Sequence, residues 1–178
     1  KPMPIPVPPT PTPTATATPT TRQMAINLGT GLKTADEFRQ ALRAGNLNNI
    51  GGIGGHSNEM LESPGFTVAP KETKVNLVVI SVAELGFTNA TMRKDIYARA
   101  EQLGWELCPA EVGPQLRLQY KDQQTGEYLR IGMKPIADSK GDNRVFNVFQ
   151  DNGLLVGSDY ADEDRYWNPG DHWVFVIP

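Results

Sequence analysis

The sequence is poor in the residues that form disulfides and metal centres. It contains one cysteine, Cys108, and two histidines, His56 and His172. A single cysteine excludes a disulfide within the chain. A zinc centre would require these three residues to converge from separate regions, and their spacing matches no zinc-binding pattern. We therefore expect neither a disulfide nor a zinc centre, and the cysteine content indicates no cellular compartment.

Long apolar runs and an excess of charge are also missing. The longest apolar run, residues 75–82, is interrupted by Asn76 and Ser81 and is far shorter than the ~20 residues that a membrane span requires. With 17 Lys and Arg against 20 Asp and Glu, the formal net charge is −3. This balance gives no electrostatic reason to expect nucleic acid or an anionic membrane as a partner.

Proline, in contrast, is concentrated at the start of the chain. Residues 1–21 (KPMPIPVPPTPTPTATATPTT) hold eight of the 15 prolines. Proline fixes φ and removes a backbone donor, and Thr and Ala supply little apolar area, so polyproline II and coil are expected here. The sequence thus predicts a Pro/Thr-rich linker over residues 1–22 and a single globular domain over residues 23–178.

In composition, this segment resembles the Pro-Thr linkers that join catalytic and carbohydrate-binding modules in secreted cellulases, hemicellulases and cellulosome proteins. The resemblance implies a secreted, extracellular bacterial protein with a neighbouring domain covalently attached through the linker. It also implies O-glycosylation of the linker threonines, which are Thr10, Thr12, Thr14, Thr16, Thr18, Thr20 and Thr21. The alternative is a proline-rich terminus of a cytoplasmic protein.

The remaining residues predict an α+β domain, with a mainly antiparallel sheet and about two helices. A capping box at Thr34 and Glu37 predicts a helix over residues 35–44. A second helix, capped by Asn89 or Thr91, is expected to end at residue 103. Between these helices, residues 46–65 contain a GGIGG run and are expected to form a loop. The run lacks the spacing of a phosphate-binding loop and a preceding strand, so a structural loop is the favoured interpretation.

Strands are predicted by β-branched runs and by alternation of apolar and polar residues. Residues 75–82 are apolar on both faces, which is typical of a central strand. Asn152 and Gly153 form a favourable hairpin turn. The expected strands are residues 75–82, 116–120 paired with 127–136, 145–150 paired with 154–158, and 172–177.

The densest group of polar and aromatic residues lies between the last two of these strands, at residues 159–171 (DYADEDRYWNPGD). Aromatic rings stack on the C–H faces of sugar rings while carboxylates accept from sugar hydroxyls, so this loop is a candidate carbohydrate site. The alternative is a solvated acidic loop with Tyr166 and Trp167 packed beneath it. The candidate ligand-binding residues are Asp159, Tyr160, Asp162, Asp164, Tyr166 and Trp167.

Three other chemistries have weaker patterns. The acidic loop could hold calcium, although the EF-hand spacing is absent both there and at residues 138–143. Glu106 and Glu111 could form the carboxylate pair of a glycoside hydrolase if the fold sets their carboxyl groups at the right separation. The alternative is two surface glutamates beside a proline turn. Cys108, between Leu107 and Pro109, is typical of a small buried thiol rather than a nucleophile.

Residues 106–142 (ELCPAEVGPQLRLQYKDQQTGEYLRIGMKPIADSKGD) resemble a family of hypothetical bacterial proteins of uncharacterised function, many of them from candidate phyla. Residues 81–87 (SVAELGF) and 173–176 (WVFV) fit the same resemblance, which covers about residues 60–178. Because that family has no established activity, the resemblance assigns no catalytic residues.

Linker and acidic loop together favour a non-catalytic accessory or binding module of a secreted bacterial protein, with a polysaccharide as its expected partner. Two alternatives stay open. One is a small hydrolase of polysaccharide or cell-wall material that uses Glu106 and Glu111. The other is a protein-interaction domain.

Overall fold

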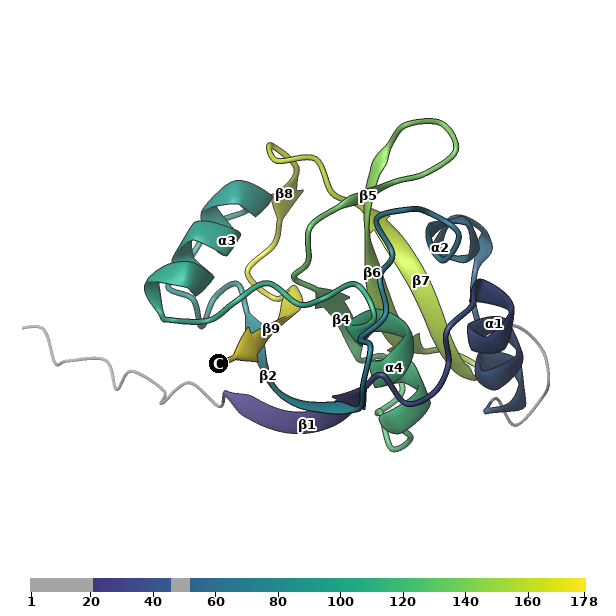
Figure 1. The fold of residues 1–178 in the computed structure, drawn as a ribbon. Coiled ribbons are helices and arrows are strands. Elements are labelled where there is room, and N and C mark those ends of the chain that lie inside the picture. Colours follow the sequence, from purple (N-terminus) through teal and green to yellow (C-terminus); the bar gives the residue numbers. More distant parts are fainter. Residues whose placement is uncertain (1–20, 46–51) are drawn as a thin grey trace, which may run out of the picture.

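The computed structural model describes residues 21–45 and 52–178 (Figure 1). The predictions for linker residues 1–20 and for residues 46–51 of the glycine loop lie outside the described residues. The first described element, β1 (Arg22–Leu28), begins at a residue that the sequence placed in the linker.

Seven strands in the described part form one sheet in the order β1-β2-β9-β4-β6-β5, with β7 also paired to β6. All neighbouring strands are antiparallel except β4 and β9, which are parallel. Two short strands, β3 and β8, form a separate ladder. The predicted α+β class with a mainly antiparallel sheet is confirmed. The strands after β1 are β2 (Thr73–Ser81), β3 (Thr91–Met92), β4 (Tyr128–Ile131), β5 (Ile136–Ala137), β6 (Asn143–Gln150), β7 (Leu154–Tyr160), β8 (Tyr166–Trp167) and β9 (His172–Ile177).

The described residues form four helices: α1 (Ala35–Ala44), α2 (Gly55–Met60), α3 (Arg93–Gln102) and α4 (Val112–Gln119). Figure 1 shows α1, α2 and α4 together on one side of the molecule and α3 on the other. The ring of Tyr97 from α3 makes edge contacts with Trp173 and Phe175 of β9. Successive strand residues point to opposite faces, so β9 directs these two aromatic rings towards α3.

Elements with strong local signals lie where the sequence predicts them. Helix α1 spans residues 35–44, and both hydrogen bonds of its capping box are present between Thr34 and Glu37. The hairpin of β6 and β7 turns at Asn152 and Gly153, which both have positive φ. Helix α3 is also present, but its N-cap is Met92, so Asn89 and Thr91 do not cap it.

One predicted strand is wrong. Residues 116–120 belong mostly to α4 rather than to a hairpin with β4. Their alternation of apolar and polar residues predicts a strand, yet every residue from Val112 to Arg117 is buried, so burial does not follow the period of two of a half-exposed strand. Pro114 lies in the first turn of α4, where its missing N–H costs no helical hydrogen bond. Gly113 lets this helix approach β6, because an added Cβ would lie 2.6 Å from Cβ of Phe146.

Helix α2 and strand β1 were also missed, as were the two-residue strands β3 and β8. Helix α2 lies inside the predicted loop of residues 46–65. Its N-cap is Gly54, which has no side chain that could cap the helix and so gives no sequence signal for its start. Strand β1 borders the sheet and has only two buried residues, Ile26 and Leu28, so its apolar pattern is weak. It also follows the proline-rich segment without a turn signal that would mark where the strand begins. Tertiary contacts therefore determine α2 and β1 more than local propensity does.

The turn between β5 and β6 is closed by Asp138. Its Oδ2 accepts from Arg144 Nε at 2.6 Å, and its Oδ1 accepts from the backbone N–H groups of Lys140 and Asp142 at 2.9 and 3.0 Å. These bonds, chiefly the one from Arg144, hold the pKa of Asp138 at about 2, below its ordinary 3.8.

We expect the domain to lose stability in acid as the Asp138 carboxylate becomes protonated. Its folded-state pKa lies below its unfolded value, so its contribution is complete above about pH 4 and is lost as the pH falls towards about 2. Urea unfolding midpoints of the parent and of Asp138→Asn, measured from pH 7 to pH 2, test this. The parent's advantage over the variant should shrink across that window. Parallel curves for the two proteins would contradict the assignment.

Candidate functional site

The structure separates the six candidate residues of the acidic loop. Asp159 and Trp167 meet around Arg130, which comes from β4. Tyr160 lies against two other arginines, and Tyr166 borders a surface hollow. The remaining two, Asp162 and Asp164, are exposed. The loop therefore does not form one continuous platform of aromatic rings and carboxylates.

Arg130 links the loop to the sheet. Its guanidinium lies 4.6 Å from the ring centroid of Tyr128 and 4.7 Å from that of Trp167. Its Nε lies 3.3 Å from Asp159 Oδ2, and its Nη1 lies 3.2 Å from Asp171 Oδ1. The acceptor capacity of Asp159 is therefore partly used within the protein.

Trp167 belongs to the core. Only 4% of it is exposed, and its ring makes an edge contact with Trp173 at a centroid distance of 5.0 Å. The opposite face of its strand carries Tyr166, which is 59% exposed. The alternative of a solvated loop with both aromatic residues packed beneath it therefore describes Trp167 but not Tyr166. Tyr166 has the exposure that stacking on a sugar needs.

The position of Tyr166 is fixed by backbone bonds to the start of α3. Met92 of β3 pairs with Tyr166 of β8. The N–H of Arg93 donates to the carbonyl of Arg165 at 2.9 Å, and that of Lys94 donates to Glu163 at 3.1 Å. Because Trp167 is held in the core and Arg165 is bonded to α3, the exposed ring between them is held on a rigid support.

Beside this ring lies a hollow of about 370 Å³. Its lining offers hydroxyl, amide and carboxylate groups together with two aromatic residues, Phe87 and Tyr166. The carboxylate is that of Asp95, in the first turn of α3, and it is exposed. The lining residues that carry functional groups are Thr88, Asn89, Thr91, Asp95 and Tyr166. These groups can donate to and accept from a neutral hydroxylated ligand.

Tyr160 is 41% exposed, and its ring is partly covered by arginine. The guanidinium of Arg144 lies 3.9 Å from the ring centroid and that of Arg165 lies 5.5 Å from it. Arg144 is itself bound to Asp138. With one face of its ring occupied in this way, Tyr160 is a less open platform than Tyr166.

Glu106 and Glu111 have unlike environments. The carboxylate of Glu111 is buried and accepts from the N–H of Gly29 at 2.8 Å, the N–H of Ala69 at 2.8 Å and Gln115 Nε2 at 3.0 Å. Glu106 is exposed and pairs through its backbone with Val176. Because Glu111 is engaged by three donors, its geometry indicates a structural role and does not favour the paired-carboxylate hydrolase.

Cys108 is fully inside the domain. Its Sγ donates to the carbonyl of Val174 at 3.4 Å, and burial raises the pKa of the thiol. Such a thiol stays protonated and is a poor nucleophile or metal ligand. Within residues 21–45 and 52–178, no three His, Cys, Asp or Glu side chains are grouped closely enough to hold a metal ion.

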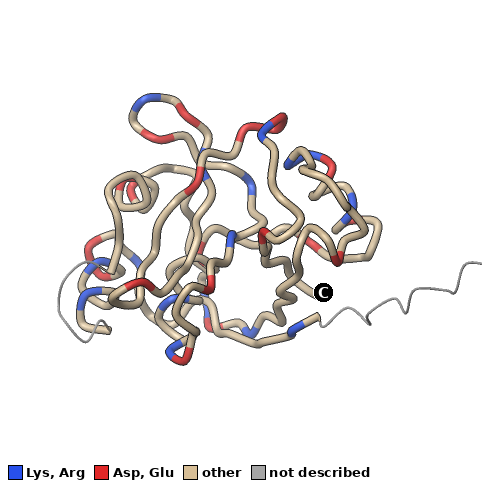
Figure 2. The backbone as a smooth tube through the Cα atoms, turned by 180° about the vertical axis from the view of Figure 1, so that it is seen from behind, with Lys and Arg blue, Asp and Glu red and all other residues tan. Residues whose placement is uncertain are grey.

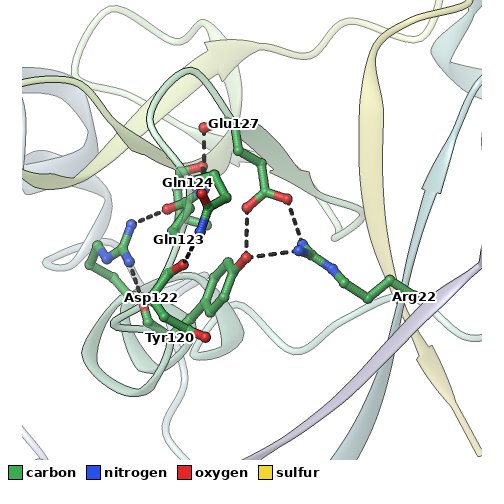
Figure 3. A network of polar contacts seen from close by, with 8 residues as sticks. Arg22, Tyr120, Asp122, Gln123, Gln124 and Glu127 are labelled. Carbon is green, nitrogen blue, oxygen red and sulfur yellow. Dashed lines mark hydrogen bonds and ion pairs between the residues drawn. The ribbon is translucent and has the colours of Figure 1, made fainter.

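Figure 3 shows a separate polar network that fixes the segment between α4 and β4. Arg22 Nη1 donates to the Tyr120 hydroxyl at 2.8 Å, and that hydroxyl donates to Glu127 Oε2 at 2.8 Å. Arg22 Nη2 and Glu127 Oε1 form an ion pair at 2.7 Å. The side-chain amide of Gln123 donates to the carbonyls of Glu127 and Val148. This network ties the segment to β1 and β6.

A second hollow, of about 360 Å³, lies at the start of β4 and is lined in part by Tyr128 and Phe149. Their rings stack with a centroid distance of 5.2 Å and an angle of 18° between planes. One side of the Tyr128 ring also carries Arg130, so this aromatic pair is largely engaged with the protein.

The residues that the sequence analysis missed come from other segments. Asp95 falls within the second predicted helix, Asn89 is one of the two residues predicted to cap it, and Arg130 falls within a predicted strand. The only sequence signal for them is the run TNAT, residues 88–91, whose small polar side chains line the hollow. Only the fold brings that run beside Tyr166.

Charge does not single out another surface. Figure 2 shows Lys and Arg interspersed with Asp and Glu along most of the backbone. The exception is residues 145–164, whose charged side chains are all acidic and which include part of the acidic loop. No helix in the described part of the chain is long and apolar enough to cross a membrane. Comparisons of the chain with protein-family models, with curated proteins and with solved structures found no match. Support for a function therefore comes from the residues of the chain itself.

Proposed function

We propose that this domain is a non-catalytic binding module that contacts carbohydrate through Tyr166 and the hollow beside it, as an accessory part of a secreted bacterial protein. The observation that carries the proposal is a tyrosine, 59% exposed, on a strand with a hydrogen-bonded backbone at the rim of a hollow lined by polar groups. Buried tyrosines are common, but an exposed ring on a fixed strand offers a flat apolar face to a ligand.

The chemistry of the hollow suits a sugar. A pyranose presents C–H groups on its faces and hydroxyls at its edge, so it is best bound by one aromatic face and several convergent polar groups. Tyr166 supplies the face. Asp95 and Asn89 supply acceptors for hydroxyls, and Thr88 supplies a hydroxyl that both donates and accepts. The Thr91 hydroxyl donates to the carbonyl of Asn89 at 2.9 Å, so it offers an acceptor only. The Pro/Thr-rich segment supports the proposal, since it resembles linkers that hold such modules in secreted enzymes.

A protein partner is the second candidate. It is favoured by the exposed Tyr160 with Arg144 and Arg165 close to its ring, because tyrosine and arginine are enriched at protein interfaces. The hydrolase alternative is not favoured, because Glu111 is engaged by three internal donors.

Replacing Tyr166 with alanine should abolish or weaken sugar binding. Loss of one stacking face costs roughly 1 to 1.5 kcal/mol, which weakens binding about ten-fold. Affinity electrophoresis in soluble glucans, xylans and mannans, and pull-down on cellulose, chitin and peptidoglycan, would measure it. Tyr166→Phe keeps the ring and should retain most of the binding.

The matched control is Leu103→Ala. Leu103 is 41% exposed at the other end of α3, so this change removes exposed apolar area without touching the hollow. Binding should survive it. If the parent domain is retained on none of these glycans, or if Tyr166→Ala binds as the parent does, the proposal is wrong.

A further inference from the structure

Strand β1 is the border of the seven-stranded sheet. In the described part of the chain it pairs with β2 only, over residues 22–28. In Figure 1 it runs along the outside of the sheet, beyond β2. A border strand presents unpaired N–H and C=O groups along its outer side, and these can bind another strand.

The side chain of Gln119 identifies which groups point outward. Its Oε1 accepts from the N–H of Asn27 at 2.9 Å, and its Nε2 donates to the carbonyl of Asn27 at 2.8 Å. This amide occupies the place that a neighbouring strand would take. Outward-pointing residues alternate along an antiparallel border strand, so Gln23 and Ala25 also present both backbone groups outward.

These two residues are open to a partner. Both are exposed, and among residues 21–45 and 52–178 no hydrogen bond to the outward groups of Gln23 or Ala25 is present. A hollow of about 250 Å³, lined in part by Met24, Ala25 and Tyr120, lies beside Ala25. The opposite border differs, because β7 is covered at Val156 by backbone bonds with Gly52 and Gly54.

Two common protections of a border strand, lysine and proline, are also missing from β1 (residues 22–28, RQMAINL). The one charge, on Arg22, is neutralised by Glu127 at 2.7 Å. Two copies of β1 can therefore approach without like charges of residues 22–28 facing each other, although Asp122 lines the hollow beside Ala25.

We propose that β1 pairs antiparallel with β1 of a second copy of this chain, forming a two-fold symmetric dimer with a continuous sheet. A two-fold axis at Met24 places Gln23 of each copy opposite Ala25 of the other, so both open residues of each strand exchange N–H and C=O bonds. Gln119 ends the pairing at Asn27. This proposal is independent of the sugar site.

Concentration-dependent measurements on the full chain test the proposal. Sedimentation equilibrium should show the mass doubling as concentration rises. Amide hydrogen exchange should show the N–H groups of Gln23 and Ala25 becoming at least about ten-fold more protected over the same range. A chain that stays monomeric at all concentrations, or unchanged exchange at these two amides, would overturn it.

Variants locate the contact. Ala25→Pro removes the outward N–H and should weaken dimerisation at least about ten-fold, whereas Ala25→Val keeps it and should not. Gln119→Ala uncovers Asn27, lengthens the open border and should tighten the dimer, so it gives a result even if the proline variant fails to fold. A dimer unaffected by both Ala25→Pro and Gln119→Ala would assign the association to another surface.

Discussion

Replacing Glu111 with alanine is expected to lower the free energy of unfolding by about 3 to 5 kcal/mol. The buried carboxylate joins three parts of the chain, because it accepts from Gly29 after β1, from Ala69 before β2, and from Gln115 in α4. Alanine would leave two backbone N–H groups without an acceptor in a region closed to water. Each such group costs about 1 to 3 kcal/mol, and the lost side chain adds a cavity.

Urea unfolding followed by circular dichroism measures this effect, and Glu106→Ala is its control. Glu106 is an exposed glutamate in the same segment, so its truncation should change stability by less than about 0.5 kcal/mol. Glu111→Gln should fall between the two, because its amide offers one acceptor oxygen but turns an NH₂ group towards the other backbone donor. Equal stability of the two alanine variants would refute the structural role and reopen a catalytic one.

Local signals account for the elements that could be predicted. The capping box of Thr34 and Glu37, the β-branched run in β2 and the Asn152-Gly153 turn each act over a few residues, so the sequence displays them directly. Helix α4 could not be read in this way. Its eight residues contain Gly113 and Pro114, and packing of that glycine against Phe146 supplies a reason for the helix that no window of sequence contains.

The candidate site was predictable only in part. The density of aromatic and acidic residues at 159–171 pointed to the loop that carries Tyr166, which is exposed. Composition could not say that Trp167, one residue later, faces the core, because that depends on the side of β8 that packs on Trp173. Asp95 and Arg130 lie 71 and 36 residues before Tyr166 in the sequence, so only the fold brings α3 and β4 to the loop.

Gly132→Ala is expected to destabilise the domain by about 3 kcal/mol. Gly132 is buried just after β4, where its N–H donates to Val174 at 2.8 Å and its carbonyl accepts from Cys108 at 2.7 Å. An added Cβ would lie 2.3 Å from Cε1 of Phe175, whose ring is held by Tyr97 and Trp105. Because backbone and ring are both fixed, neither can move away without losing contacts.

Chemical denaturation of Gly132→Ala beside Gly55→Ala would measure this cost. A Cβ at Gly55 meets no atom within 4 Å, so that control adds a methyl group without a clash and should unfold at or slightly above the parent's midpoint. In the double variant Gly132→Ala with Phe175→Leu, the smaller side chain makes room for the methyl group. The double variant should therefore lose less free energy of unfolding than the two single variants lose in sum. Additive losses, or a parental midpoint for Gly132→Ala, would show that β4 and β9 are not packed as tightly at this point as the ring contacts imply.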